Sequence, residues 1–235
     1  GLISIMLANN EIGTIQPIEE VVKIAKKYGT LVHTDAVQCL GKMNIDVQKL
    51  GVDFLSLSAH KFYGPKGIGA LFVKDPKILE PFIIGGGQEN TFRAGTENIA
   101  YIAAMGLASE IATKSITKNM NHITFLENYF KKKLKNNFRN IAFNGSQSQK
   151  LPGIISISFL GFRSDIILIQ LDREKIYVSN GSACGSGIVK PSHVLSAIGL
   201  DESTNLSTLR FSFGNNNNLD EIKTLVNILK YKLLK

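Results

Sequence analysis

A buried strand that leads directly into a lysine constrains this chain more than any other sequence feature. Apolar residues alternate through residues 54–58, a pattern typical of a strand with one face in a core. His60 and Lys61 follow at once, and Gly64 and Pro65 end the segment. An ammonium group is costly beside a buried strand, but partial burial lowers a lysine pKa and yields a nucleophilic amine that forms Schiff bases with carbonyl compounds. The alternative is a lysine that extends to solvent.

Strands and helices alternate in the first part of the chain. We predict a mostly parallel α/β sheet, although the last two strands are close enough in sequence to form a hairpin. One helix is marked by Pro17 near its start and by Gly29 at its end. The predicted strands are residues 2–8, 30–34, 54–58 and 68–73, and the predicted helices are residues 17–28 and a short segment after Asp35.

The second part of the chain carries longer helical patterns. With 235 residues, the chain is long enough for two domains with hydrophobic cores. We predict that residues 1–112 belong to a large α/β domain and that residues 113–235 form a smaller α/β domain. The elements predicted after residue 97 are helices at 98–114, 123–138, 164–173 and 220–234 and strands at 154–159 and 208–213.

Charge and cysteine content limit the classes of partner and the cellular compartment that we expect for this protein. The net charge is +8 with a pI near 9.4, but the basic residues are scattered over helix faces, so we expect an acidic protein partner rather than direct nucleic-acid binding. No apolar run reaches the roughly 18 residues of a membrane span. Two cysteines make no disulfide framework, and no Cys/His cluster has zinc-ligand spacing. We therefore expect a cytoplasmic protein with no stable metal site.

Asp35 follows a second predicted strand and is a candidate cofactor ligand. Open α/β sheets place ligands at the carboxyl ends of their strands. A carboxylate there can keep the ring nitrogen of pyridoxal phosphate (PLP) protonated, and Lys61 can react with the PLP aldehyde. The alternative is that Asp35 caps the helix after it. The presence of Asp35 and Lys61 at two strand ends of one sheet favours the cofactor.

Other residues of the first part receive less specific interpretations. Ser58 and His60 flank the lysine and can bind a phosphate. We interpret His33 as a packed polar residue rather than a catalyst, and Cys39, among apolar neighbours, as a small core residue. The glycine run at 85–87 favours a flexible loop over a phosphate cradle.

Two residues of the second part indicate chemistry. Cys184 lies among small residues at 179–187, so we expect an accessible and reactive thiol. Arg210 lies inside the apolar pattern of residues 208–213. An arginine there needs a planar anionic partner, and a substrate carboxylate would serve.

Seven motifs, in this order and spacing, resemble the class I (NifS/IscS-type) cysteine desulfurases, PLP enzymes of the class-V aminotransferase family. Each motif is weak alone, but the set is specific and runs from end to end of the chain. The resemblance implies PLP-dependent transferase fold type I, like that of aspartate aminotransferase, in an N-terminally truncated form. The motifs are ANNEIGT at 8–14, HTDAVQ at 33–38, SAHKFYGPKG at 58–67, GGGQE at 85–89, RAGTEN at 93–98, GSAC at 181–184 and LRFS at 209–212.

The resemblance implies how PLP would be held. Lys61 would bind PLP covalently and then transfer protons. Asp35 would face the ring nitrogen and Gln38 the phenolic oxygen. Ser58 and His60 would bind the phosphate.

The same resemblance implies a substrate and partners. Asn10 would contact the cofactor and, with Arg210, hold the carboxylate of L-cysteine. Cys184 would take the sulfur as a persulfide and leave L-alanine. Thr96 would reach the phosphate of a partner subunit, which implies a homodimer. The sulfur would then pass to an iron–sulfur scaffold protein or to another sulfur acceptor, such as a tRNA-thiolation relay.

Three alternatives stay open from the sequence. Selenocysteine lyases share the fold and the chemistry. The chain opens within a strand pattern and has no signal-peptide features, so we expect an N-terminal portion to be missing. A chain of that kind could be an inactive remnant that only binds partners. The third alternative, a basic nucleic-acid binder, is supported by net charge alone.

Overall fold

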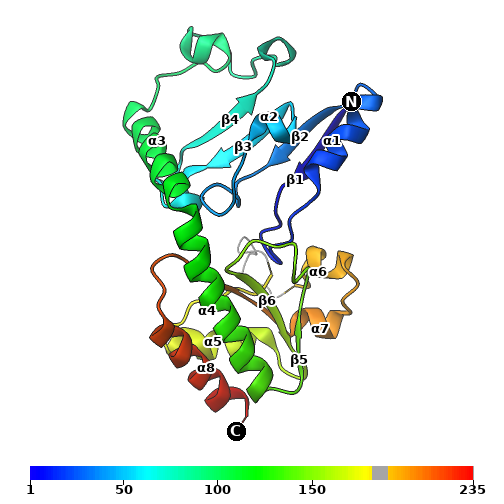
Figure 1. The fold of residues 1–235 in the computed structure, drawn as a ribbon, viewed down its shortest axis with the longest axis vertical. Helices are drawn as coiled ribbons and strands as arrows, with labels where there is room; N and C mark the ends of the chain where they lie inside the picture. Colours follow the sequence, from blue (N-terminus) through cyan, green and yellow to red (C-terminus); the bar gives the residue numbers. More distant parts are fainter. Residues whose placement is uncertain (182–189, 235) are drawn as a thin grey trace. The chain divides into compact units, whose positions relative to one another are not determined.

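A computed structural model describes residues 1–181 and 190–234 of the chain (Figure 1). Cys184 therefore lies outside the described residues. The chain divides into two compact units, of which the first comprises residues 1–8 and 16–116 and the second comprises residues 9–15 and 117–235. The short segment at 9–15 thus belongs to the second unit, although first-unit residues flank it on both sides. None of the described helices is long and apolar enough to cross a membrane.

The first unit is built on a four-stranded sheet of order β1-β2-β3-β4. The first three strands are parallel to one another, and β3 and β4 are antiparallel. The prediction of a mostly parallel sheet is therefore confirmed, and the hairpin considered for the last two strands is present as well. The strands are β1 (Leu2–Met6), β2 (Leu31–Asp35), β3 (Phe54–Ser58) and β4 (Gly69–Val73).

Helix α1 (Ile18–Lys27) covers part of this sheet and contacts β2. Its buried residues, Ile18, Val22 and Ala25, recur at the spacing of one helix face. Gly29 follows with a φ of 62°, which a glycine adopts without a steric penalty. The helix end that Gly29 marks in the sequence is therefore confirmed to within one residue.

The short helix predicted directly after Asp35 is wrong. The amide of Val37 donates to the Asp35 carboxylate at 2.8 Å, and the amide of Cys39 donates to the carbonyl of Ala36 at 2.9 Å. These short-range bonds close turns in place of the i to i−4 bonds of an α-helix. The next helix along the chain is α2 (Val47–Leu50).

Helix α3 (Ile99–Lys114) packs against the 3-10 turn η1 (Ala59–Phe62) through Ala59, Phe62 and Ala112. Its residues are apolar around most of its circumference, which is typical of a buried helix, yet several of them are exposed. Two further 3-10 turns, η2 (Pro76–Ile78) and η3 (Gln88–Thr91), lie in the chain between β4 and α3. The large apolar residues exposed on α3 are Ile99, Tyr101, Ile102, Leu107 and Ile111.

The second unit has an antiparallel sheet of order β5-β6-β7. Helices α4, α5 and α8 supply most of the core with the apolar face of this sheet (Figure 1). Phe130 of α4 and Phe211 of β7 meet with ring centroids 5.1 Å apart. The elements are α4 (Ile116–Asn137), β5 (Ile141–Phe143), β6 (Ile154–Phe159), α5 (Ser164–Arg173), α6 (His193–Ala197), α7 (Glu202–Leu206), β7 (Thr208–Ser212) and α8 (Leu219–Leu233).

Candidate active site

Asp35 and Lys61 lie at the same edge of the first unit's sheet. Asp35 is the last residue of β2 and pairs in register with Ser56 of the parallel strand β3. β3 ends at Ser58, and Lys61 follows in η1. Because the carboxyl ends of parallel strands share one edge, both residues lie where open α/β sheets bind ligands.

The Asp35 carboxylate is oriented by a turn. One carboxylate oxygen accepts the Val37 amide at 2.8 Å, and the backbone carbonyl of Asp35 accepts the Leu7 amide at 2.8 Å. The residue is half-buried. The helix-capping interpretation of Asp35 is wrong, because turns rather than a helix follow it.

Gln38 and Lys42 extend this site beyond the residues expected to line it. The Gln38 side-chain oxygen accepts a hydrogen bond from the Lys42 ammonium group at 3.4 Å. Burial lowers the pKa of Lys42, Cys39 raises it, and the charge of Lys61 lowers it further. Lys42 was not among the predicted site residues, although it is the one charged residue in the mostly apolar stretch at 36–45.

Ser58 and His60 form a pair beside Lys61. The Ser58 hydroxyl and His60 Nδ1 are 2.9 Å apart, which links the two residues expected to bind a phosphate. The side chains of His60 and Lys61 are exposed. Partial burial of Lys61 is thus not observed, because the residue lies on an exposed turn beyond the strand rather than within it.

His33 and Cys39 have structural positions. His33 Nδ1 lies 2.7 Å from the Ser4 hydroxyl and its Nε2 lies 2.8 Å from the Ser56 hydroxyl, so the imidazole joins three strands. Cys39 is fully buried, and burial raises the pKa of its thiol to about 12. Lys42 opposes this rise and Asp35 adds to it. Both residues are confirmed as packed parts of the fold.

Thr96 lies in the exposed segment that joins η3 to α3. Short-range hydrogen bonds hold this segment. The Ala94 amide donates to the Ile83 carbonyl at 3.1 Å, and the Gly95 amide donates to the Gln88 side-chain oxygen at 3.2 Å. The glycines at 85–87 are exposed in the same region. No described hydrogen bond joins Thr96 to another candidate residue within the first unit.

Asn10 and Arg210 meet in the second unit. The Arg210 guanidinium donates through Nη1 to the backbone carbonyl of Asn10 at 3.1 Å. Arg210 pairs in register with Ser156, so it lies on the polar face of the sheet rather than on the face that forms the core. The apolar neighbours of Arg210 in the strand face the core, whereas Arg210 itself lies on the polar face of the sheet. Both residues are half-buried.

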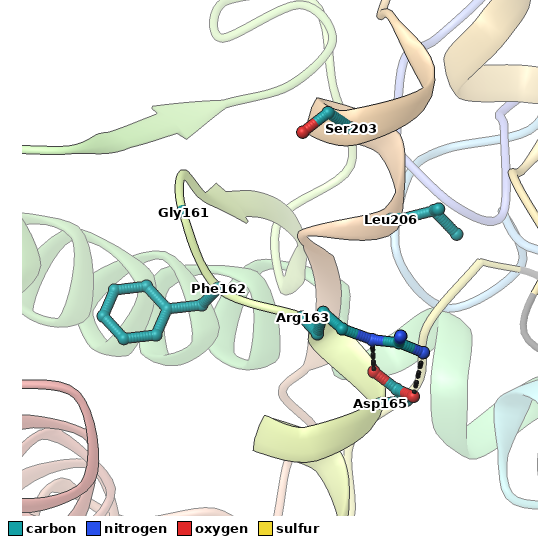
Figure 2. A pocket seen from close by; sticks show the side chains of 6 residues that line it. All are labelled: Gly161, Phe162, Arg163, Asp165, Ser203 and Leu206. Atoms are coloured by element: carbon teal, nitrogen blue, oxygen red, sulfur yellow. Dashed lines mark hydrogen bonds and ion pairs between the residues drawn. The ribbon is translucent and has the colours of Figure 1, made fainter.

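A surface pocket of about 290 Å³ in the second unit contains none of the candidate residues (Figure 2). Arg163 in this pocket forms a forked ion pair with Asp165, with N–O distances of 3.1 and 2.8 Å. The charge of Arg163 is therefore already compensated. Within residues 1–181 and 190–234, no three His, Cys, Asp or Glu side chains are grouped to hold a metal ion. The pocket is lined by Gly161, Phe162, Arg163, Asp165, Ser203 and Leu206.

Comparison with known proteins gives a consistent set of relatives. Residues 1–225 match the aminotransferase class-V family. The cysteine desulfurase IscS of Dictyoglomus turgidum is 46% identical over 229 residues, which cover 97% of this chain and 58% of the relative. IscS of Methanosarcina thermophila is 41% identical over 228 residues, with 97% and 56% covered. The chain thus spans a little over half the length of these curated relatives.

Solved structures agree with these matches. The NifS-like protein of Rickettsia africae superposes with a TM-score of 0.90 and 36% identity, covering 98% of this chain and 61% of that one. The apo cysteine desulfurase of Thermococcus onnurineus gives a TM-score of 0.83 and 25% identity, covering 99% and 60%. The fold expected from the motifs, PLP-dependent transferase fold type I, is therefore confirmed.

Proposed function

The chain belongs to the aminotransferase class-V family, and on this premise we propose that it acts as a PLP-dependent cysteine desulfurase. The observation that carries the proposal is the set of side chains at the carboxyl edge of β2 and β3. Asp35, Lys61 and the Ser58–His60 pair offer, within one unit, a carboxylate, an amine and two phosphate-binding groups. Relatives named cysteine desulfurase match along 97% of the chain.

The residues present fit PLP in chemical type. The Lys61 amine would hold the aldehyde carbon, the Asp35 carboxylate would keep the ring nitrogen protonated, and Ser58 and His60 would bind the phosphate. Gln38 would hydrogen-bond the phenolic oxygen, and Asn10 would add a further contact. When bound, PLP supplies an electron sink for bond cleavage in the substrate.

The charges around this edge also suit a phosphate. Lys61 is close enough to Lys42 for its charge to lower the pKa of the Lys42 ammonium group. Two cations at one sheet edge create a field that favours an anionic ligand. Since Lys42 also holds the Gln38 side-chain oxygen, it would orient Gln38 toward the ring.

The substrate would be L-cysteine. Arg210 and Asn10 would bind its carboxylate, for which a guanidinium is suited by its planar fork of donors. Cys184 would receive the sulfur: the carbon–sulfur bond of L-cysteine breaks, a sulfur–sulfur bond to Cys184 forms, and the carbon takes up a proton to give L-alanine. The thiol and the substrate together hold all the atoms and electrons that this conversion needs.

We further propose that the protein is a cytoplasmic homodimer that delivers sulfur to an iron–sulfur scaffold or another acceptor protein. The exposed apolar residues of α3 support a subunit interface, because isolated soluble proteins seldom expose large apolar patches. Thr96, exposed ahead of α3, would reach the phosphate site of the partner subunit. Light scattering of the PLP-loaded protein tests this, and a monomer at micromolar concentration would count against it.

The activity is tested by incubating the chain with PLP and L-cysteine and measuring alanine by mass spectrometry. We expect alanine to form in the unchanged chain, to disappear in Lys61→Ala and Cys184→Ala, and to persist in Lys74→Ala, an exposed lysine outside the site. After borohydride reduction, PLP should be found on the peptide that carries Lys61. If the chain retains no PLP, or if Lys61→Ala forms alanine at the original rate, the proposal is wrong.

A further inference from the structure

The solvent-facing side of α4 carries cations and an exposed aromatic ring. Lys118, Phe125 and Lys132 recur every seven residues, a spacing that keeps them near one line along a helix. Lys135 lies nearly one turn after Lys132, and Arg139 lies just beyond the end of the helix. All five residues are exposed, whereas the buried residues of α4 lie on the opposite side of the helix. We call these five residues the basic face of α4.

The chain around this face has an uneven charge balance. Residues 128–164 contain seven lysines and arginines and no aspartate or glutamate. Three of the seven cations form ion pairs, with Glu127 or with Asp165. Within the part of the chain that the structure describes, the other four form no ion pair, and these are Lys132, Lys133, Lys135 and Arg139. The basic face therefore carries positive charge that no described ion pair compensates.

Aromatic rings hold some of these lysines in place. The Lys133 ammonium nitrogen lies 5.4 Å from the centre of the Tyr129 ring. The ammonium nitrogens of Lys131 and Lys135 lie 5.7 and 5.6 Å from the centre of the Phe143 ring. Cation–π contacts of this kind restrict long side chains, so less rotamer entropy is lost when a partner binds.

Phe125 differs from the other aromatic residues of α4. It is 55% exposed, whereas Tyr129 is half-buried and Phe130 is buried. Phe125 lies between Lys118 and Lys132 on the basic face, so cations flank it on both sides along the helix. Protein interfaces are built in this way, with an aromatic anchor at the centre and charged or polar residues around it.

We propose that the basic face of α4 binds an acidic segment of a partner protein, which places an apolar side chain on Phe125. Carboxylates on the segment complement the cations, and opposite charges speed association and set specificity. A nucleic acid fits less well, because single strands stack successive bases on a row of aromatic rings. The rings of Tyr129 and Phe143 already face ammonium groups. This inference goes beyond the desulfurase activity, since the binding needs neither PLP nor cysteine.

Two labelled helical peptides and one labelled RNA serve as probes. The first peptide consists of glutamates and alanines, with leucines spaced three and four residues apart along one face. The second peptide has alanine in place of each leucine. The RNA is a single-stranded oligouridylate. Fluorescence anisotropy with the purified full chain measures the Kd of each probe at low salt and at physiological salt.

The charge contribution is tested by two double variants. Lys132→Gln with Lys135→Gln removes two charges from the basic face, and Lys23→Gln with Lys27→Gln removes two exposed charges from α1. Both lower the net charge equally. We expect the first to weaken binding of the leucine peptide by about fivefold or more at low salt, and the second by less than about twofold. Equal losses would show that only net charge matters and would overturn the proposal.

The anchor is tested by Phe125→Ala, with Ile24→Ala on α1 as the matched control because Ile24 is 57% exposed. We expect Phe125→Ala to weaken binding of the leucine peptide by about fivefold or more and that of the alanine peptide by less than about twofold. Ile24→Ala should leave both within about twofold. If Phe125→Ala and Ile24→Ala bind the leucine peptide equally well, Phe125 is not an anchor and the proposal is wrong.

The RNA decides between the two classes of partner. We expect it to bind more weakly than the leucine peptide at physiological salt, because nucleic-acid binding by exposed lysines falls steeply with salt. RNA that binds more tightly than either peptide, with a loss in the double variant of the basic face, would overturn the proposal in favour of a nucleic acid. Circular dichroism melts should show every variant folded, since each altered side chain is exposed.

The outcome is independent of the activity assay. A chain that binds the leucine peptide through the basic face but forms no alanine would support this inference while the desulfurase proposal fails. A chain that forms alanine but binds neither peptide would overturn this inference and leave the desulfurase proposal standing.

Discussion

The carboxylate of Glu127 accepts a hydrogen bond from the Lys150 ammonium group at 2.7 Å, and both side chains are less than a tenth exposed. Lys131 is a second ion-pair partner at 2.6 Å, and the Gly153 amide donates to the other carboxylate oxygen at 2.7 Å. These contacts join α4 to the turn that leads into β6. A buried carboxylate with this many donors is a structural group of the second unit.

Removal of this carboxylate should be strongly destabilising. Glu127→Ala leaves the buried Lys150 without its counter-charge, and losing one partner of a buried pair costs about 3–5 kcal/mol. Urea unfolding followed by circular dichroism measures the loss. The control is Lys223→Ala, which breaks the exposed ion pair with Asp220 and should leave the unfolding midpoint unchanged. Equal midpoints for the two variants would contradict this assignment.

The same carboxylate should make stability depend on acid pH. Burial by itself raises the pKa of Glu127, but the charge of Lys150 and the hydrogen bonds from Lys131, Lys150 and Gly153 outweigh it and lower the pKa from 4.5. A lowered folded-state pKa gives stability that is present above the unfolded value and lost as pH falls through the folded value. The stability advantage over Glu127→Gln should therefore shrink as the pH falls from about 5 through the lowered folded-state pKa of Glu127. A constant difference would show that Glu127 is not held ionised.

Sequence patterns predicted the longer elements because local periodicity and tertiary burial agree in them. The predicted bounds of β3, β6 and α5 equal the observed ones. Strand β5 was missed, since three residues carry no usable alternation. Helix α4 begins at Ile116 rather than at residue 123, because its polar first turns have no apolar face to reveal them. Helices α6 and α7 have five residues each, with caps at Ser192 and Asp201 as their main signals.

The candidate site was predictable where it follows from strand ends. Asp35 and Lys61 were predicted to lie near each other because each follows the carboxyl end of a strand in the same sheet. The structure puts them at one sheet edge. Lys42 was missed because a sequence does not reveal which charged residues become partly buried in turns. The allocation of residues 9–15 to the second unit likewise depends on long-range contacts that no local pattern encodes.

Gly41 should tolerate no side chain, because it faces α3. Its φ is 77°, and a Cβ there would lie 2.8 Å from the Cβ of Ala112. Gly41→Ala should therefore lower the free energy of unfolding by about 1–2 kcal/mol because of the left-handed backbone, and by about 1–3 kcal/mol more because of overpacking. Gly67→Ala is the matched control, since its φ is 85° but nothing lies within 4 Å of the added Cβ. Equal melting temperatures for the two variants would refute the packing contribution.

Substitutions of His33 and His60 should have different effects: the first should lower stability, and the second should weaken cofactor binding. His33→Ala removes the imidazole that joins Ser4 and Ser56 and should cost about 1–3 kcal/mol, with PLP affinity unchanged. His60→Ala alters an exposed residue of the proposed phosphate site, so it should weaken PLP binding several-fold and leave the melting temperature unchanged. Thermal melts and PLP titrations on both variants provide the check. The assignment is wrong if His33→Ala is the variant that loses PLP.

The two cysteines should differ sharply in reactivity. Burial raises the pKa of the Cys39 thiol to about 12, so at pH 8 only about one molecule in ten thousand carries the thiolate. Iodoacetamide should therefore label one thiol in the folded chain and two in urea, with peptide mass spectrometry placing the folded-state label on Cys184. Cys39→Ala should leave the folded-state count at one, and Cys184→Ala should reduce it to none. Rapid labelling of Cys39 in the folded chain would mean that the turn after Asp35 opens in solution, which would also undo the orientation of the Asp35 carboxylate.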